Sequence, residues 1–264
     1  MRNRKSEQAE ARRLHSETYT VRVEGVRVQY RRVGDPACEP VVLVHGLSGS
    51  MHWWLRNVRS LAQTRCVYLV DLPGFGSMHR SPTRFTLTQA GAWLVAWMDA
   101  VGLERVNLIG HSMGGYICIW IAAHHPERVA RLVLVSPAVR SQVHSIWGYT
   151  LPLLTAIRYL SPGFLLILSY DALRAGPRTL LHATYDLLRQ DIHEEIRAVT
   201  APTLLVWGMG DTLVPPSLAR VLRGEMPHAR LLLLDKAGHV SMFDQAQRFN
   251  EAVNAFLDDE VVGE

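Results

Sequence analysis

The chain has 264 residues, of which 48% are hydrophobic and 20% are charged, and these fractions are ordinary for one sizeable globular domain. Its three cysteines, Cys38, Cys66 and Cys118, form neither a CxxC pair nor an even set, which argues against a disulfide scaffold and a zinc site. The net charge of +4 comes from the first 34 residues, because the other 230 carry 19 basic and 20 acidic residues, and no nucleic-acid motif is present.

Residues 1–18 are predicted to be a flexible basic arm, because their charges are mixed and they lack an apolar pattern. The arm has no apolar core of a signal peptide, so a cytoplasmic location is expected. The longest apolar stretch, residues 146–170, is interrupted by prolines, an arginine and a glycine, which argues against a stable membrane span. We expect a monomer or a homodimer, and the sequence leaves the choice open.

Short apolar strands alternate with helices along most of the chain. Residues 19–23 and 26–33 are predicted to form an antiparallel hairpin around Gly25. The buried strands are predicted at residues 41–44, 66–70, 106–109, 132–135, 203–207 and 231–234, and the helices at residues 52–62, 87–101, 116–125 and 218–223, with a last helix that buries Phe249, Val253 and Phe256. This alternation predicts an α/β fold with a mostly parallel, doubly wound sheet.

The alternation stops between Ser136 and Val199, where the sequence is rich in leucine, has proline and glycine interruptions, and contains no buried strand. We therefore predict a helical cap at residues 136–199, inserted into a core formed by residues 19–135 and 200–264. The apolar cap residues either line a pocket or pin the cap to the core. They are Leu151, Leu153, Leu154, Ile157, Leu160, Phe164, Leu165, Leu166, Ile167 and Leu168.

Residues 110–114 read GHSMG and lie between a predicted buried strand and a helix. In this pattern, the nucleophile elbow, a strained turn lifts a serine above the carboxyl edge of a sheet. The glycines are a steric requirement, since side chains there would collide with the neighbouring strand and helix. The alternative is that Ser112 merely caps the following helix, because serine is a preferred N-cap residue.

Two later loops place an acid and a histidine after predicted strands. Asp211 follows the strand at 203–207, and His239 follows the strand at 231–234. The carboxyl ends of parallel strands share one edge of the sheet, so these side chains can meet Ser112. The order Ser, Asp, His is that of the α/β-hydrolase triad.

With these motifs the chain resembles the α/β-hydrolase superfamily, in its serine esterase or lipase-like branch with a helical cap, from about residue 19 to residue 257. The resemblance implies that Ser112 is the nucleophile, His239 the general base and later acid, and Asp211 the group that orients the imidazole. His45 and Gly46 resemble the family's oxyanion turn. By that resemblance, the backbone N–H groups of Leu47 and Met113 would form the oxyanion hole.

Gly46, Trp53 and Val240 are expected to contribute to substrate binding, while Trp54 and Phe243 are left open between pocket and core. Asp71 lies in a turn that is mostly structural in this family. Other polar residues near the motifs are not expected to act in catalysis: Asp235 is too close to His239 in sequence to reach behind its ring, His111 should point away from the nucleophile, and His124 and His125 suit a surface helix end.

The predicted activity is hydrolysis of carboxylic esters with small to medium apolar acyl groups through an acyl-enzyme, with water as second substrate and with neither cofactor nor metal. Epoxide-opening and halide-displacing relatives use an aspartate nucleophile, so the serine disfavours them. C–C hydrolases often have a tryptophan after the catalytic histidine, where this chain has Val240. A C–C hydrolase, a lactonase and a small-molecule receptor of the same fold stay open as alternatives.

Overall fold

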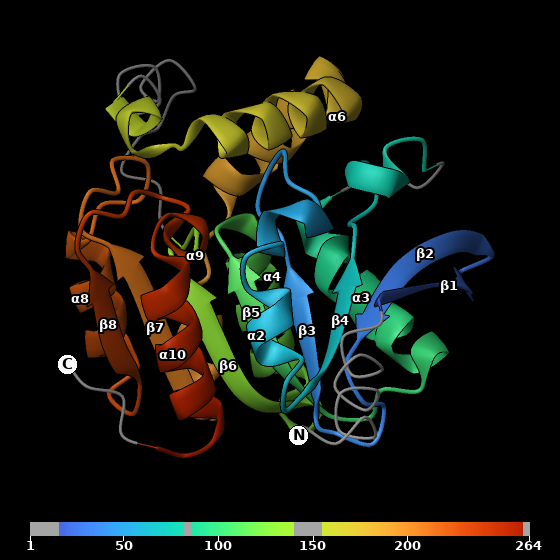
Figure 1. Cartoon of the computed structure of the whole chain (residues 1–264), viewed down its shortest axis with the longest axis horizontal. Coiled ribbons are helices and arrows are strands. Elements are labelled where there is room, and N and C mark those ends of the chain that lie inside the picture. Colours follow the sequence, from blue (N-terminus) through green and yellow to red (C-terminus); the bar gives the residue numbers. More distant parts are fainter. Residues whose placement is uncertain (1–15, 82–85, 140–154, 261–264) are drawn as a thin grey trace, which may run out of the picture.

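A single eight-stranded sheet forms the centre of the computed structural model, which describes residues 16–81, 86–139 and 155–260 (Figure 1). The strand order is β1-β2-β4-β3-β5-β6-β7-β8. The first two strands and β4 pair in antiparallel fashion, and all later neighbours are parallel. The α/β class with a mostly parallel sheet is therefore confirmed. Most of the predicted basic arm lies outside the described residues.

The strands correspond closely to the apolar runs of the sequence, and the central ones are buried along their whole length. Their bounds are β1 Ser16–Val23, β2 Val26–Val33, β3 Pro40–Val44, β4 Cys66–Val70, β5 Val106–His111, β6 Val129–Val135, β7 Thr203–Gly208 and β8 Arg230–Leu234. The hairpin is longer than predicted, because Ser16 pairs with Val33 across the antiparallel register.

Helices cover both faces of the sheet, as the predicted alternation requires (Figure 1). On one face α3 (Leu87–Val101), α4 (Met113–His124) and α8 (Ser217–Glu225) share a core that contains Trp97 and Ile117. On the other face α2 (Val58–Leu61), α9 (Ser241–Asp244) and α10 (Ala246–Leu257) pack around Trp54 and Phe249. Trp54 is thus a core residue.

The helix predicted at 52–62 was wrong as one element. The structure has a 3-10 turn, η1 (Met51–Trp54), followed by the short helix α2. Between them, the buried side chain of Asn57 donates hydrogen bonds to Met242 O at 2.8 Å and to Asn250 Oδ1 at 2.9 Å. These long-range bonds anchor the segment to α9 and α10, and they are invisible to a periodicity argument.

Between β6 and β7 the described chain is helical, with η5 (Ile157–Tyr159), α6 (Pro162–Arg189) and α7 (His193–Ala198). Helix α6 is kinked at Gly176, whose φ of 75° and ψ of 158° are not helical, and Pro177 follows directly. It lies above the carboxyl ends of the central strands (Figure 1). Leu151, Leu153 and Leu154 lie outside the described residues. No helix in the described ranges is long and apolar enough to cross a membrane.

The remaining short elements are η2 (Gly76–Met78) and η3 (Pro126–Arg128). Two helix ends agree with the sequence signals. Helix α3 ends at Gly102, which adopts the left-handed φ of 81° that a glycine stop provides, and α4 ends one residue before His125. Helix α4 starts at Met113, three residues earlier than predicted, because the elbow turns directly into the helix.

Candidate active site

Ser112 occupies a strained turn between β5 and α4. Its φ of 51° and ψ of −116° place a non-glycine residue at positive φ. The turn is held by backbone bonds on both sides, since Ser112 N donates to Val135 O at 2.9 Å and Ser112 O accepts from Ala138 N at 3.1 Å. The serine side chain makes no capping hydrogen bond to the helix. Ser112 therefore occupies the N-cap position of α4, but its hydroxyl does not cap the helix.

The glycines around Ser112 allow backbone atoms to approach so closely that a side chain at either position would collide with them. A Cβ atom on Gly110 would lie 2.5 Å from Gly114 O, and one on Gly114 would lie 2.4 Å from Val44 O. Distances below 3.0 Å require a shift, and here the obstructing atoms belong to the backbone. The steric requirement predicted for the glycines is thus confirmed, and it brings α4 against the end of β3.

Asp211 and His239 come together across the loops that follow β7 and β8. Asp211 Oδ2 accepts a hydrogen bond from His239 Nδ1 at 2.8 Å, and the Asp211 side chain is fully buried. Its other oxygen accepts from Leu213 N and Val214 N, each at 2.9 Å. Backbone N–H groups of its own loop hold the carboxylate in place. Because Nδ1 of His239 bonds to this carboxylate, Nε2 is the ring nitrogen left for other partners.

His111 connects this pair to the elbow. Its ring lies 4.8 Å from the His239 ring, and its Nε2–H donates to His239 O at 2.9 Å. Burial lowers the pKa of His111 well below its usual value, so the ring is neutral, and the proton sits on Nε2 because a carbonyl can only accept. His111 is adjacent to Ser112 in the chain, and its side chain contacts the backbone of His239.

The His-Gly turn also lies against the elbow. A Cβ atom on Gly46 would lie 3.2 Å from Ser112 Cβ and 2.7 Å from His111 Nδ1. His45 is buried, and burial lowers its pKa. Its Nε2 accepts from Leu72 N at 3.0 Å and its Nδ1–H donates to Gly46 O at 2.8 Å. His45 therefore has a structural role and anchors the turn beside Ser112.

Asp71, in the loop after β4, completes this support. Its carboxylate accepts hydrogen bonds from Met51 N and Ser77 N, each at 2.7 Å. A Cβ atom on Gly76 would lie 2.4 Å from that carboxylate, so the loop closes tightly around it. Both of these donors are backbone N–H groups, one at the start of η1 and one in η2.

The two N–H groups expected to bind an oxyanion belong to Leu47, which follows the His-Gly turn, and to Met113, which follows Ser112. Met113 is the first residue of α4, and N–H groups of a first helical turn have no partner within the helix. Leu47 directly follows Gly46 in the turn that contacts Ser112. Both backbone groups thus belong to segments that adjoin Ser112, and the N-terminus of α4 adds a dipole there that favours negative charge.

Trp53 lies between the elbow and α6. Its ring is 5.5 Å from the His111 ring and 5.1 Å from the Phe164 ring, and its Nε1–H donates to Asp171 Oδ2 at 3.1 Å. Ser50 Oγ donates to the same carboxylate oxygen at 2.7 Å. Burial raises the pKa of Asp171. Asp171, which the sequence did not single out, thus ties α6 to the segment that follows the His-Gly turn.

Two further residues support the histidine loop and were missed by sequence reasoning. Asp244 accepts from Gly238 N at 2.9 Å, and burial raises the pKa of Asp244 to about 6. The Tyr159 side chain packs on the loops that carry Asp211 and His239, because a Cβ atom on Gly210 would lie 2.2 Å from Tyr159 Cζ and one on Gly238 would lie 2.8 Å from Tyr159 Cβ. The absence of side chains at two loop glycines was the only available signal.

The other predicted residues fall in the core or on the surface. Val240 and Phe243 are buried; the Arg56 guanidinium lies over the Phe243 ring, and the Phe164 ring packs against it at a tilt of 56°. Asp235 is exposed. At the helix end, His124 Nδ1 bonds to a backbone oxygen within the helix and His125 pairs with Glu127 at the surface. In the parts of the chain that the structure describes, no three His, Cys, Asp or Glu side chains are grouped to hold a metal ion.

The apolar cap residues pack mainly against the core. Phe164 is buried between Trp53 and Phe243, and Leu160, Ile167 and Leu168 pack against the same core. Leu166 is 75% exposed. These contacts favour the reading in which the cap leucines pin α6 to the core.

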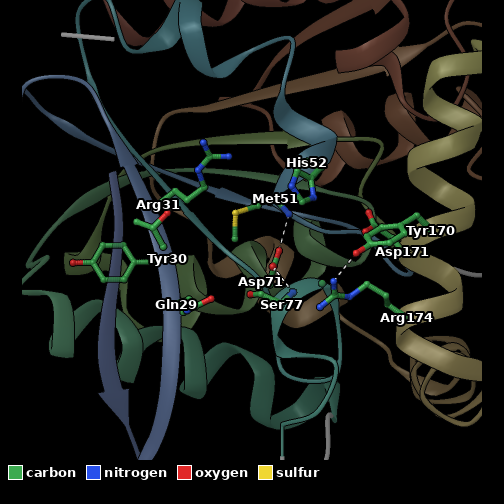
Figure 2. A pocket seen from close by; sticks show the side chains of 12 residues that line it. Gln29, Tyr30, Arg31, Met51, His52, Asp71, Ser77, Tyr170, Asp171 and Arg174 are labelled. Carbon is green, nitrogen blue, oxygen red and sulfur yellow. Dashed lines mark hydrogen bonds between the residues drawn. The ribbon is translucent and has the colours of Figure 1, made fainter. Parts of the chain in front are cut away.

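A cavity of about 250 Å³ lies between β2, η1 and α6 (Figure 2). Met51, His52 and Asp171 line it on the side of η1 and α6, and Tyr30 and Arg31 line it on the side of β2. Ser112, Asp211 and His239 are not among its lining residues. The cavity is therefore separate from the Asp211–His239 pair.

Comparisons with known proteins agree with this architecture. The family profile described as alpha/beta hydrolase fold matches residues 39–160 and 153–246. The chain is 30% identical to a dihydrolipoyllysine-residue acetyltransferase component of an acetoin cleaving system from Pseudomonas putida, over 89% of this chain and 68% of that protein. It is also 30% identical to a 2-hydroxymuconate semialdehyde hydrolase from Pseudomonas putida, over 83% of this chain and 86% of that protein.

A solved structure shows the same fold. The enol-lactonase from Burkholderia xenovorans superposes with a TM-score of 0.76 at 23% identity, covering 91% of this chain and 100% of that chain. The profile match covers more than half of the sequence, and the sheet order, elbow and loop arrangement agree with it. The chain therefore belongs to the α/β-hydrolase family.

Proposed function

We propose that the protein is a serine hydrolase that cleaves carboxylic esters of small to medium apolar acyl groups through an acyl-enzyme intermediate. The observations that carry the proposal are the 2.8 Å bond from His239 to the buried Asp211 carboxylate and the 2.9 Å bond between His239 O and His111, the residue before the strained Ser112. A hydrolase activity agrees with the family and with the similarity to a 2-hydroxymuconate semialdehyde hydrolase.

In the proposed reaction, Ser112 Oγ attacks the ester carbonyl carbon while His239 Nε2 takes the serine proton. The carbonyl oxygen becomes an oxyanion, which the N–H groups of Leu47 and Met113 would stabilise. Donors of this kind are typically worth about 100- to 1,000-fold in rate each. When the intermediate collapses, the C–O bond to the alcohol breaks and His239 returns the proton to the leaving oxygen.

Water completes the cycle. His239 takes a proton from a water molecule, whose oxygen attacks the acyl carbon of the Ser112 ester. The second tetrahedral intermediate then releases the carboxylic acid, and the proton returns to Ser112 Oγ. Asp211 keeps the imidazole in the tautomer that both steps need and stabilises its charged form. The buried, loop-held carboxylate suits this role because it has little freedom to turn away.

Cleavage of C–C bonds is the second candidate. It is favoured by the 30% identity to a 2-hydroxymuconate semialdehyde hydrolase, whose name denotes a semialdehyde substrate. It is disfavoured by Val240, which follows His239 where ring-cleavage hydrolases often have a tryptophan and which is buried in the core here.

Steady-state kinetics of the purified protein distinguish ester hydrolysis from C–C cleavage. The substrates are p-nitrophenyl acetate, butyrate, octanoate and decanoate, and 2-hydroxymuconate semialdehyde is measured in parallel. The ester hypothesis predicts repeated turnover with an optimum in chain length and a much lower kcat/KM for the semialdehyde. A higher kcat/KM for the semialdehyde would replace it with C–C hydrolysis. A single stoichiometric burst without turnover on every substrate would instead support a receptor of the same fold.

A further inference from the structure

The cavity between β2, η1 and α6 lies outside the proposed catalytic centre and has charged side chains among its lining residues. Figure 2 shows that its walls carry charged side chains from separate elements, with Arg31 on β2, Asp71 after β4, and Asp171 and Arg174 on α6. Its volume of about 250 Å³ is just under the range of about 300–1,000 Å³ of pockets for drug-sized ligands. It therefore has room for a small organic or inorganic ion.

Both arginines of the cavity lack an acidic partner. Within residues 16–81, 86–139 and 155–260, neither Arg31 nor Arg174 makes an ion pair. Arg31 donates from Nε and Nη2 to the single hydroxyl of Ser16, at 3.0 and 2.6 Å. Two positive charges thus line one cavity without a carboxylate bound to either of them.

Arg174 is only partly satisfied by its neighbours. Its Nη1 donates to Tyr170 Oη at 2.6 Å and its Nη2 donates to His79 Nδ1 at 3.0 Å. Its Nε is buried and has no hydrogen-bond partner among the described residues. A guanidinium has five N–H donors and no acceptor, so several of its donors stay available. Figure 2 shows the Arg174 guanidinium directed from α6 toward Ser77 and Asp71.

The two carboxylates on the wall are already bound to other donors. Asp71 accepts from two backbone N–H groups, each at 2.7 Å. Asp171 accepts from Ser50 Oγ at 2.7 Å and from Trp53 Nε1 at 3.1 Å. The spare hydrogen-bonding capacity of the cavity is consequently richest in positively charged donors, and a complementary ligand has to supply acceptors and negative charge.

We propose that this cavity binds a small oxyanion, a carboxylate or phosphate group, through Arg174 and Arg31. Arg174 would be the main contact, because its planar fork matches two anionic oxygens and its buried Nε lacks a partner. Arg31 lines the cavity from β2, where its guanidinium bonds to Ser16. The site concerns ligand binding and does not depend on the ester-hydrolase proposal, since no catalytic residue lines it.

Isothermal titration calorimetry on the full chain tests the site, with inorganic phosphate, succinate and the uncharged succinamide at constant ionic strength. Saturable binding of phosphate or succinate at one site per chain is expected, with no binding of succinamide. The anion that binds more tightly identifies which oxyanion the site prefers. Repeating the titration with Ser112→Ala separates this site from the catalytic one, because that variant should bind the anion as the wild type does.

The variants Arg174→Gln and Arg31→Gln localise the binding. Arg174→Gln should weaken the anion about tenfold, the loss expected from one charge-assisted hydrogen bond. Arg178→Gln, which removes a charge from an exposed position of the same helix, is the matched control and should bind as the wild type does. If Arg174→Gln does not fold, the affinity of Arg31→Gln for the anion tests the site independently. Absence of saturable binding, binding of succinamide as tight as succinate, or equal loss in Arg178→Gln would overturn the proposal.

Discussion

At the scale of single residues, Asp211 is the group whose removal tests the proposed mechanism most cleanly. Asp211→Asn keeps the size of the side chain but presents an amide to His239, which favours the wrong tautomer of the imidazole. We expect kcat for ester hydrolysis to fall by about 10⁴-fold, with little change in thermal unfolding. Asp235→Asn, an exposed position on the histidine loop, is the control and should keep full activity. Equal activity of both variants would remove Asp211 from the mechanism.

Asp244 makes a prediction about pH and stability. Burial raises its pKa to about 6, while Arg56 and His239 act in the opposite direction. An acid with a raised pKa in the folded protein binds its proton more tightly when folded, so stability falls as pH rises from about 4 to about 6. Asp244→Asn can still accept from Gly238 N and does not ionise. Its Tm should match the wild type near pH 4 and exceed it increasingly toward pH 7.

Thermal unfolding followed by circular dichroism at half-unit pH steps measures this difference. Asp235→Asn serves again as the matched control, because its exposed carboxylate should give a nearly constant offset. A Tm difference for Asp244→Asn that stayed constant with pH, or that was largest at low pH, would show that the buried carboxyl does not titrate in this range.

At the scale of elements, the elbow depends on glycine where α4 meets β3. A Cβ atom on Gly114 would lie 2.4 Å from Val44 O, so Gly114→Ala must push the helix away from the strand end. We expect a destabilisation of about 1–3 kcal/mol, the usual cost of overpacking, together with a loss of activity. Urea denaturation gives the free energy of unfolding.

The matched control is Gly224→Ala in α8, where an added Cβ would meet no atom within 4 Å. That substitution should stabilise the protein by about 0.5–1 kcal/mol, because alanine is the better helix former. Equal effects of the two substitutions would mean that the elbow can relax, and the steric account of its glycines would be wrong.

The elements also show where sequence patterns suffice. The buried strands and α3 follow directly from apolar runs and from the glycine stop at Gly102, since local chemistry determines them. The helix predicted at 52–62 failed because Asn57 bonds to residues about 190 positions away, and such contacts leave no local periodicity. For a similar reason the sequence left two roles open for the apolar residues between β6 and β7. Apolar residues such as Phe164 can line a pocket or fill a core, and only packing distinguishes these.

At the scale of the whole molecule, the topology explains why the candidate site could largely be located from the sequence. Ser112, Asp211 and His239 follow β5, β7 and β8, whose carboxyl ends lie at one edge of the parallel sheet. Asp171, Asp244 and Tyr159 could not be found that way. Asp171 joins α6 to the segment after the His-Gly turn, while Tyr159 and Asp244 contact the loops of Asp211 and His239. No local motif marks such contacts.

The most direct test of the central claim is whether Ser112 forms an acyl-enzyme during ester turnover. Intact-protein mass spectrometry after rapid quenching with p-nitrophenyl butyrate, together with steady-state rates, should be performed on the wild type, Ser112→Ala and the exposed-serine control Ser217→Ala. The account predicts a butyryl adduct and turnover in the wild type and in Ser217→Ala. In Ser112→Ala, the adduct should be absent and kcat should fall by about 10⁶-fold. An adduct or undiminished turnover in Ser112→Ala would contradict it.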